Sequence, residues 1–129
     1  MAISVVRLGS ARASDEGLRI GTVRRPPRGV AKARFAADDW YDVWFPTLAP
    51  SVETMKLGQA ATSAAQWAAF CKRYRSEMTL PEAKHAIELL AAMSQRANFA
   101  VGCYCEHEAR CHRSVLRDLL REHGAKLRD

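Results

Sequence analysis

The order of apolar segments in the second half of the chain most constrains its fold. Apolar residues recur at helical spacing over 63–78 and again over 79–95. FAVGCY (99–104) is then typical of a short buried strand, and CHRSVLRDLLREHG (111–124) of an amphipathic helix that ends at Gly124. Helices and strands in this order predict an α/β domain, in which helices cover a small, mostly parallel sheet and the chain ends in a strand, a loop and a helix.

Two short patterns indicate where the first two helices begin. Ser63 is followed at the right distance by Gln66, and Thr79 by Glu82, so each pair fits a capping box. The sequence therefore predicts helix N-caps at Ser63 and Thr79.

The first half of the chain completes the sheet. ISVVRL (3–8) and LRIGTV (18–23) are β-branched runs joined by a polar segment, and a further short strand is expected near 41–45. A chain of 129 residues, 48% of them hydrophobic, suits one compact domain with its own core. We expect a single domain over 1–129.

The N-terminus and the hydropathy favour a soluble protein. No apolar run approaches the roughly 18 residues that a spanning helix needs, and MAISVVRLGS lacks the features of a signal peptide. We therefore expect a cytoplasmic protein without membrane contacts. In a reducing compartment we expect its four cysteines not to form structural disulfides.

The segment CYCEHEARCHRS (103–114) concentrates the reactive side chains of the chain, and one interpretation is a structural zinc site or a redox-sensing module. Thiolates and imidazoles are the ligands that zinc prefers, although Cys-x-Cys followed by Cys-His is not a common zinc spacing. The candidate ligands are Cys103, Cys105, Cys111, His107 and His112.

A second interpretation is a catalytic thiol. Cys105 lies at the exit of the predicted strand and Cys111 at the start of the last helix, where backbone N–H groups and nearby cations stabilise a thiolate. The order of strand, cysteine, loop and helix resembles the loops of rhodaneses and cysteine-dependent phosphatases, with an imperfect spacing of the arginines. A third interpretation is that the cysteines are core residues, which we favour for Cys71 and Cys103.

A basic turn suggests a partner for the same helix end. Residues 1–34 carry eight Lys or Arg against two acids, and three of these cations lie in RRPPRG (24–29). We expect an anion pocket for a phosphate-bearing small molecule, a nucleotide or a nucleic-acid end between this turn and the last helix. His112 would transfer a proton if a reaction occurs. The residues expected to hold the anion are Arg24, Arg25, Arg28, Arg113 and Ser114. A basic turn that faces only solvent is the alternative.

The aromatic segment 35–50 contains one further candidate. Asp42 lies between Tyr41 and Trp44, so it could act as a base or contact a ribose. Such acids more often cap helices or pair with basic neighbours. The segment itself suits a lid, a partner surface or part of the core.

Several of these motifs together resemble a known family. RLGS (7–10), GLRIGTVRRPPRGV (17–30), WYDVWFPTLAPS (40–51), YRSEM (74–78) and GCYCEHEARCHRSVLRDLL (102–120) are similar to the domain-of-unknown-function 488 family, the YeaO-like proteins. The resemblance covers nearly the whole chain, including the arginine turn and the start of the last helix at Cys111. It implies a small bacterial cytoplasmic α/β domain, and it implies the fold rather than an activity.

Overall fold

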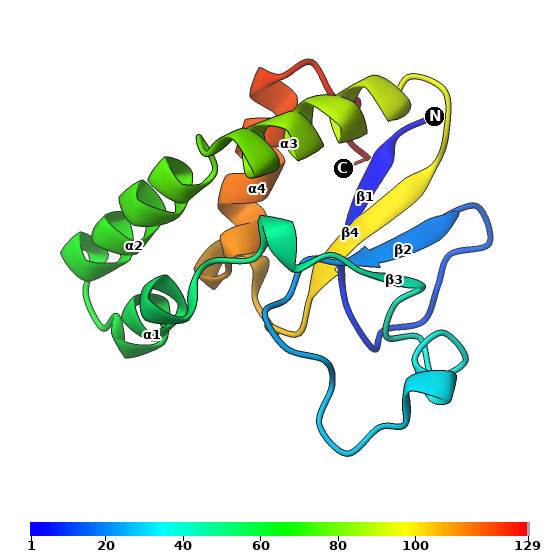
Figure 1. Ribbon diagram of the computed structural model, residues 1–129, viewed down its shortest axis with the longest axis horizontal. Helices are drawn as coiled ribbons and strands as arrows, with labels where there is room; N and C mark the ends of the chain where they lie inside the picture. The colour runs from blue at the N-terminus through cyan, green and yellow to red at the C-terminus, as the bar shows by residue number, and fades with distance from the viewer. Residues whose placement is uncertain (129) are drawn as a thin grey trace.

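Four parallel strands form one sheet in the structure, a computed structural model that describes residues 1–128 (Figure 1). They are β1 (Ile3–Arg7), β2 (Leu18–Gly21), β3 (Val43–Trp44) and β4 (Phe99–Cys103). Their order across the sheet is β1, β4, β2, β3. The last strand in sequence is thus central: Val101 pairs with Val5 on one side and with Ile20 on the other. Every residue of β4 is buried, as expected of a strand with neighbours on both edges.

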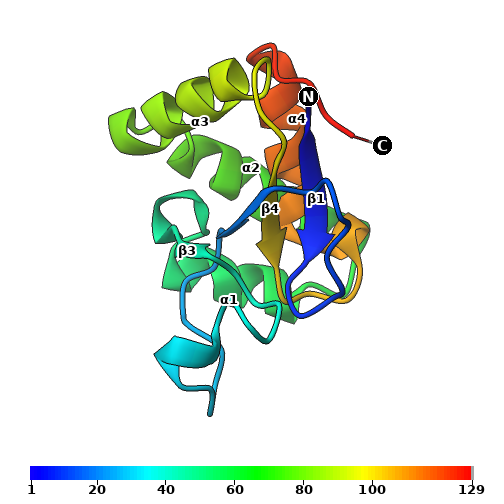
Figure 2. The same ribbon diagram turned by 90° about the vertical axis from the view of Figure 1, so that its right-hand side faces the viewer.

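The helices lie before and after β4. They are α1 (Val52–Ala60), α2 (Ala64–Glu77), α3 (Pro81–Met93) and α4 (His112–Glu122), with short 3-10 helices η1 (Lys32–Arg34), η2 (Pro46–Leu48) and η3 (Glu108–Arg110). Helices α3 and α4 pack beside the sheet, whereas α1 and α2 pair with each other and extend away from it (Figures 1 and 2). No helix among residues 1–128 is both long enough and apolar enough to cross a membrane.

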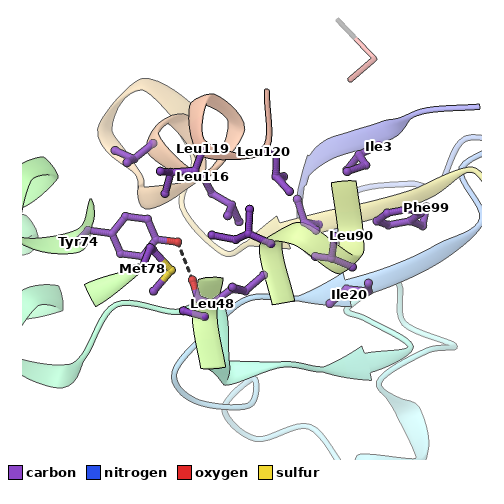
Figure 3. Close-up of a cluster of buried hydrophobic side chains, with 14 of the residues drawn as sticks. Ile3, Ile20, Leu48, Tyr74, Met78, Leu90, Phe99, Leu116, Leu119 and Leu120 are labelled. Carbon is purple, nitrogen blue, oxygen red and sulfur yellow. Dashed lines mark hydrogen bonds between the residues drawn. The ribbon is translucent and has the colours of Figure 1, made fainter. Parts of the chain in front are cut away.

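The main core lies between the sheet and the helices (Figure 3). Ile3, Ile20 and Phe99 come from three strands, and they meet Leu90 of α3 and Leu116 of α4. Each such side chain contributes roughly 1.5–3 kcal/mol when it is removed from water. The core therefore fixes α4 against the sheet, and with it the position of the segment that precedes α4.

The predicted α/β class and the predicted order of strands and helices are confirmed. The strands end one or two residues earlier than the apolar runs suggest, and β3 has only two residues. Sequence periodicity does not predict α1, because this helix has no apolar stripe: of its residues only Thr54 is buried. It is fixed instead by contacts from another helix, since Glu77 of α2 accepts hydrogen bonds from Ser51 and Thr54.

Only one of the two predicted N-caps is correct. The Ser63 hydroxyl accepts a hydrogen bond from the N–H of Gln66, as predicted, although the Gln66 side chain accepts from Thr62 rather than from Ser63. The prediction for Thr79 is wrong. Helix α3 begins at Pro81 with Leu80 before it. Thr79 lies in the turn after α2, where its hydroxyl donates to the carbonyl of Ser76. Proline needs no N–H partner in a first turn, so this helix starts without a side-chain cap.

Candidate active site

The site lies where parallel strands end and α4 begins. In open α/β sheets this carboxyl edge is the usual place for ligands and catalytic groups. Strand β4 ends at Cys103, and β2 continues directly into Thr22. The loop 104–111 contains η3 and returns the chain to His112, the first residue of α4.

Cys111 is the N-cap of α4, a position where Ser, Thr, Asp or Asn is usual. Its Sγ accepts a hydrogen bond from the N–H of Arg113 at 3.5 Å and another from Nε of the same residue at 3.4 Å. The Arg113 guanidinium also donates to the carbonyl of Cys105 at 2.7 Å. Both Cys111 and Arg113 are buried, with 2% and 3% of their surface exposed. A helix N-terminus and a guanidinium thus both direct positive charge at one sulfur.

The imidazole of His112 lies on the other side of this sulfur. Its Nε2 is 2.8 Å from the carbonyl oxygen of Thr22 and 3.3 Å from the Thr22 hydroxyl. A carbonyl oxygen only accepts, so Nε2 carries a hydrogen. Nδ1 then faces Cys111 Sγ at 3.7 Å, and the ring packs edge-on against Tyr74. The Thr22 carbonyl therefore orients the imidazole, which in turn can exchange a proton with the thiol.

Three thiols meet at this point. Cys103 Sγ donates to Cys105 Sγ at 3.7 Å, and Cys103, Cys111 and His112 place one ligand atom each within 4.8 Å of one another. Hydrogen bonds from Cys103 and then from Cys105 lower the pKa of Cys111, outweighing the burial that raises it, and His112 lowers it further. Hydrogen bonds to Cys105 and Cys111, with burial, raise the pKa of Cys103. Of the three thiols, Cys111 is thus the one whose ionisation these contacts favour.

The same atoms could hold a soft metal ion. Zinc with Zn–S bonds of about 2.3 Å in a tetrahedron separates neighbouring sulfurs by about 3.8 Å. The Cys103–Cys105 separation of 3.7 Å is close to this value. The Nε2–H of His112 donates a hydrogen bond to the Thr22 carbonyl, as the second ring nitrogen of metal-bound histidines commonly does. Cys103, Cys111 and His112 are the best-placed ligands with Cys105 beside them, whereas His107 is exposed on the loop.

The arginine turn (24–29) approaches the loop 104–111, but its three arginines have different partners. Tyr104 donates a hydrogen bond to the carbonyl of Arg25 at 2.9 Å, which joins the turn to the cysteine loop. Arg25 and Arg28 are exposed. Arg24 instead donates to carbonyls in and directly after η2, those of Pro46, Ala49 and Pro50. Of the five predicted anion contacts, Arg24 and Arg113 thus bind the protein itself, and the Ser114 hydroxyl donates to the Cys111 carbonyl.

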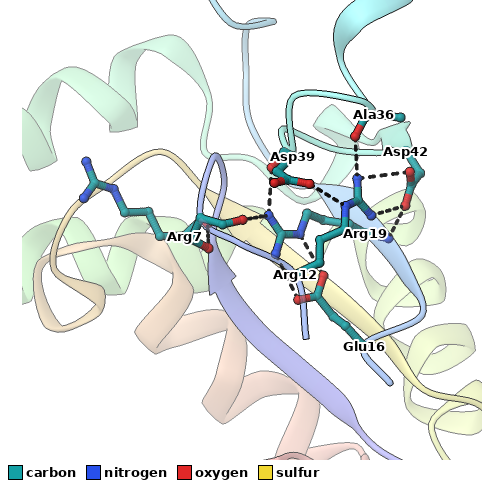
Figure 4. Close-up of polar contacts among 8 residues, drawn as sticks. Arg7, Arg12, Glu16, Arg19, Ala36, Asp39 and Asp42 are labelled. Carbon is teal, nitrogen blue, oxygen red and sulfur yellow. Dashed lines mark hydrogen bonds and ion pairs between the residues drawn. The ribbon is translucent and has the colours of Figure 1, made fainter. Parts of the chain in front are cut away.

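Asp42 belongs to a different polar cluster, together with Arg12 and Arg19 (Figure 4). Its carboxylate accepts two hydrogen bonds from Arg12, at 2.8 and 3.2 Å, and one from the N–H of Arg19. The neighbouring Arg19 is fully buried and pairs with Glu16 through two hydrogen bonds. Asp42 is therefore a structural partner of basic neighbours here, in line with the more common role of such acids.

A groove of about 380 Å³ lies beside the arginine turn, between η2 and the start of α3. Arg24 and Glu77 are among the residues that line it, and none of the cysteines is. The groove is separate from the cysteine cluster, since Tyr74 lies between His112 on one side and Leu48 of η2 on the other.

Sequence reasoning missed two residues of the site. Thr22 orients His112, and a polar residue directly after an apolar strand was the available signal. Tyr74 packs against the same imidazole, but its helical spacing indicated only a core residue. Conversely, Cys103 was expected in the core and is buried as expected, yet it also contacts the other thiols.

Comparison with known proteins gives one match. The model of a subclade described as "active DUF488-N3" matches residues 3–124. No curated protein and no solved structure matches the chain significantly.

Proposed function

The chain belongs to the DUF488 family, and we propose that it is a cysteine-dependent transfer enzyme in which Cys111 supplies the thiolate. One observation carries this proposal: Cys111 Sγ accepts hydrogen bonds from both the backbone and the side chain of Arg113 at the N-terminus of α4. Such surroundings stabilise a thiolate, which is the nucleophilic form of cysteine. The word "active" in the description of the subclade is in keeping with catalysis.

Each neighbour of Cys111 has a separate role in this proposal. His112 removes or returns the proton, because its Nδ1 faces the sulfur and its tautomer is fixed by the Thr22 carbonyl. Arg113 holds the sulfur and the loop backbone in one position. Arg25, whose carbonyl accepts a hydrogen bond from Tyr104 of the loop, and Arg28 of the same turn are both exposed and attract the anionic part of a substrate. A cysteine in such a position is suited to the transfer of sulfur or phosphoryl groups.

In this proposal fewer of the predicted residues contact the anion. A phosphate-bearing metabolite, a nucleotide or a nucleic-acid end would meet Arg25 and Arg28 first, because Arg24 and Arg113 already donate to protein groups. Substitution of both exposed arginines by Ala should weaken binding of such anions in a fluorescence or calorimetric screen. Unchanged binding would show that the turn is only a solvated basic surface.

The thiolate itself can be measured directly. We expect the ultraviolet absorbance of a thiolate to persist below neutral pH in the native protein and to disappear in Cys111→Ser. Cys71→Ser is the matched control, because Cys71 lies on α2 outside the cluster and its burial raises its pKa. A native protein whose four thiols all ionise only at alkaline pH would refute the proposal.

A zinc centre on the same side chains is a second candidate, favoured by the Cys103–Cys105 separation and the ligand atoms of Cys103, Cys111 and His112. Native mass spectrometry of protein purified without chelator separates the two candidates. A bound metal ion whose removal lowers the melting temperature supports a structural site, because metal binding contributes directly to folding. Metal-free protein of unchanged stability leaves the thiol enzyme.

A further inference from the structure

We propose that the group transferred is a sulfane sulfur delivered by a hydropersulfide, with Cys105 as the receiving thiol and Cys111 as the resolving thiol. The inference rests on the proposed function of Cys111 and names its substrate class. The three clustered thiols differ in their exposure to solvent. Cys111 and Cys103 are buried, with 2% and 7% of their surface exposed, whereas Cys105 is exposed on the loop. A substrate from solution therefore meets Cys105 first.

The exposed thiol is held against the buried ones. Cys105 Sγ lies 3.7 Å from Cys103 Sγ, and it also interacts with Cys111. The Arg113 guanidinium donates to both the Cys105 carbonyl and Cys111 Sγ, so one side chain fixes both ends of the pair. An intermediate formed on Cys105 is thereby within reach of the Cys111 thiolate without further access from solvent.

The surroundings favour sulfur over phosphoryl transfer. A phosphoryl group needs hydrogen-bond donors free to hold its oxygens next to the nucleophile. Here the Arg113 N–H and Nε both donate to Cys111 Sγ itself. The loop adds two acids, Glu106 and Glu108, which repel an anion. Glu108 is neutralised by Arg117, but Glu106 adjoins the receiving thiol. Adjacent thiols, by contrast, are what exchange between persulfides and disulfides requires.

The reaction proceeds in two balanced steps. The Cys105 proton passes to the Cys111 thiolate, and Cys105 S⁻ attacks the terminal sulfur of the hydropersulfide R–S–SH. This forms Cys105–S–SH and releases the thiolate R–S⁻. The proton on Cys111 then passes through His112 to the leaving thiolate. Cys111 S⁻ next attacks Sγ of Cys105, which forms the Cys105–Cys111 disulfide and breaks the bond to the outer sulfur, released as HS⁻. The outer sulfur is reduced and the two cysteines are oxidised, so an added dithiol must reduce the disulfide before another turnover.

The test uses the full chain and cysteine hydropersulfide as the probe. Without a reductant we expect one hydrosulfide released per chain, followed by no more until dithiothreitol is added. Free thiols are alkylated and the protein is digested with trypsin, which separates ANFAVGCYCEHEAR (97–110) from CHR (111–113). A disulfide to Cys111 appears as these two peptides linked together. A disulfide within the first peptide, between Cys103 and Cys105, would overturn the assignment of Cys111.

Variants separate the two thiols. In Cys111→Ser we expect the first peptide to gain the mass of one sulfur atom more slowly, because the acceptor of the Cys105 proton is lost as well. Fragmentation should locate this sulfur at Cys105, and hydrosulfide release should be lost. In Cys105→Ser both the added sulfur and the release should be lost, whereas Cys71→Ser should behave as the native protein. Release that persists in Cys105→Ser would overturn the proposal.

The linked peptides in the native protein provide a result that does not depend on whether a variant folds. A failure of this inference also differs from a failure of the proposed function. A thiolate at Cys111 that does not respond to the hydropersulfide rejects only the sulfane-sulfur substrate. Absence of the thiolate rejects both.

Discussion

At the scale of single residues, the four cysteines show how surroundings divide one side chain into different chemistries. Cys111 gains donors from a helix N-terminus, from Arg113 and from two thiols, and its pKa is lowered. At Cys71 on α2, burial raises the pKa by more than Arg75 and a backbone hydrogen bond lower it. Cys105 alone of the clustered thiols is exposed. Reactivity in this protein is therefore a property of position, not of cysteine content.

Replacement of Cys103 by Ala tests the largest contribution to the Cys111 thiolate. The Cys103 thiol donates to Cys111, so its loss should raise the pH at which the Cys111 thiolate forms. A hydrogen bond to a charged group contributes roughly 1.5–3 kcal/mol, or about 1–2 pH units. The thiolate absorbance as a function of pH measures this shift. Cys71→Ala should leave the titration unchanged, and an equal shift in both variants would contradict the assigned role.

Asp42 gives a prediction about pH and stability. Burial raises its pKa, but hydrogen bonds from Arg12 and from the Arg19 N–H lower it more, so the net shift is downward. A carboxyl with a lowered pKa stabilises the folded state above its ordinary pKa of about 4, and this stabilisation is lost as the pH falls through the folded-state pKa. Asp42→Asn should lower the free energy of unfolding by roughly 1–2 kcal/mol at neutral pH.

Urea unfolding at neutral and acidic pH provides the measurement for Asp42. The difference between Asp42→Asn and the native protein should shrink as the pH drops below about 4. Asp38→Asn is the control, because Asp38 forms only an exposed pair with Arg34 and should cost no more than roughly 0.5 kcal/mol. A difference that does not depend on pH would show that the Asp42 charge is not responsible.

At the scale of elements, the loop before α4 is held by contacts from three directions. Glu108 of η3 forms two hydrogen bonds with Arg117 of α4, at 2.7 and 2.9 Å. Arg110 lies over the Trp67 ring of α2, and Tyr104 donates to the arginine turn. The loop is thus tied to two helices and to the turn after β2, which keeps Cys105 next to the buried thiols.

The helix starts allow a matched comparison. Ser63 caps α2, and Ser63→Ala should lower the free energy of unfolding by about 1 kcal/mol because the Gln66 N–H loses its partner. Thr79 has the same sequence context but caps no helix, so Thr79→Ala should cost less than roughly 0.5 kcal/mol. Urea denaturation of the two variants measures both values. Equal losses would contradict the start of α3 at Pro81.

At the scale of the whole molecule, the buried ion pair of Arg19 and Glu16 joins two irregular segments in the first half of the chain. Arg19 of β2 pairs with Glu16 and also donates to the carbonyls of Ser10 and Asp39 (Figure 4). It therefore connects the segment before β2 to the segment before β3. Neither segment forms a long strand or helix, and the ion pair holds them together beside a second apolar cluster that includes Leu8, Val23 and Tyr41.

Arg19→Met should destabilise the fold strongly, because it leaves the Glu16 carboxylate buried without its partner. The expected loss in the free energy of unfolding is roughly 3–5 kcal/mol. Arg73→Met removes an exposed pair with Glu53 and should cost less than about 1 kcal/mol. Chemical denaturation compares the two. A small loss for Arg19→Met would mean that water reaches Glu16 when the guanidinium is absent.

The sequence by itself determined the fold class and the order of the main strands and helices, and it indicated the segment 103–114 as the candidate site. These features are local: apolar periodicity and residues such as Gly124, which has φ +87 at the end of α4, act within a few positions of one another. The sequence did not reveal α1, because that helix depends on Glu77 of another element rather than on an apolar stripe.

Only the tertiary structure decided how the candidate residues divide among roles. Arg24 and Arg113 have the same side chain as Arg25 and Arg28, but their donors are already bound within the protein. Arg24 donates to backbone carbonyls that are distant in sequence. Arg113 donates to the Cys105 carbonyl and to Cys111. Thr22 reaches His112 across 90 positions because β2 and β4 are neighbours in the sheet. Hydrogen bonds depend on distances in space, and contacts between remote segments are set by the packing of the sheet and its helices, which no local pattern encodes.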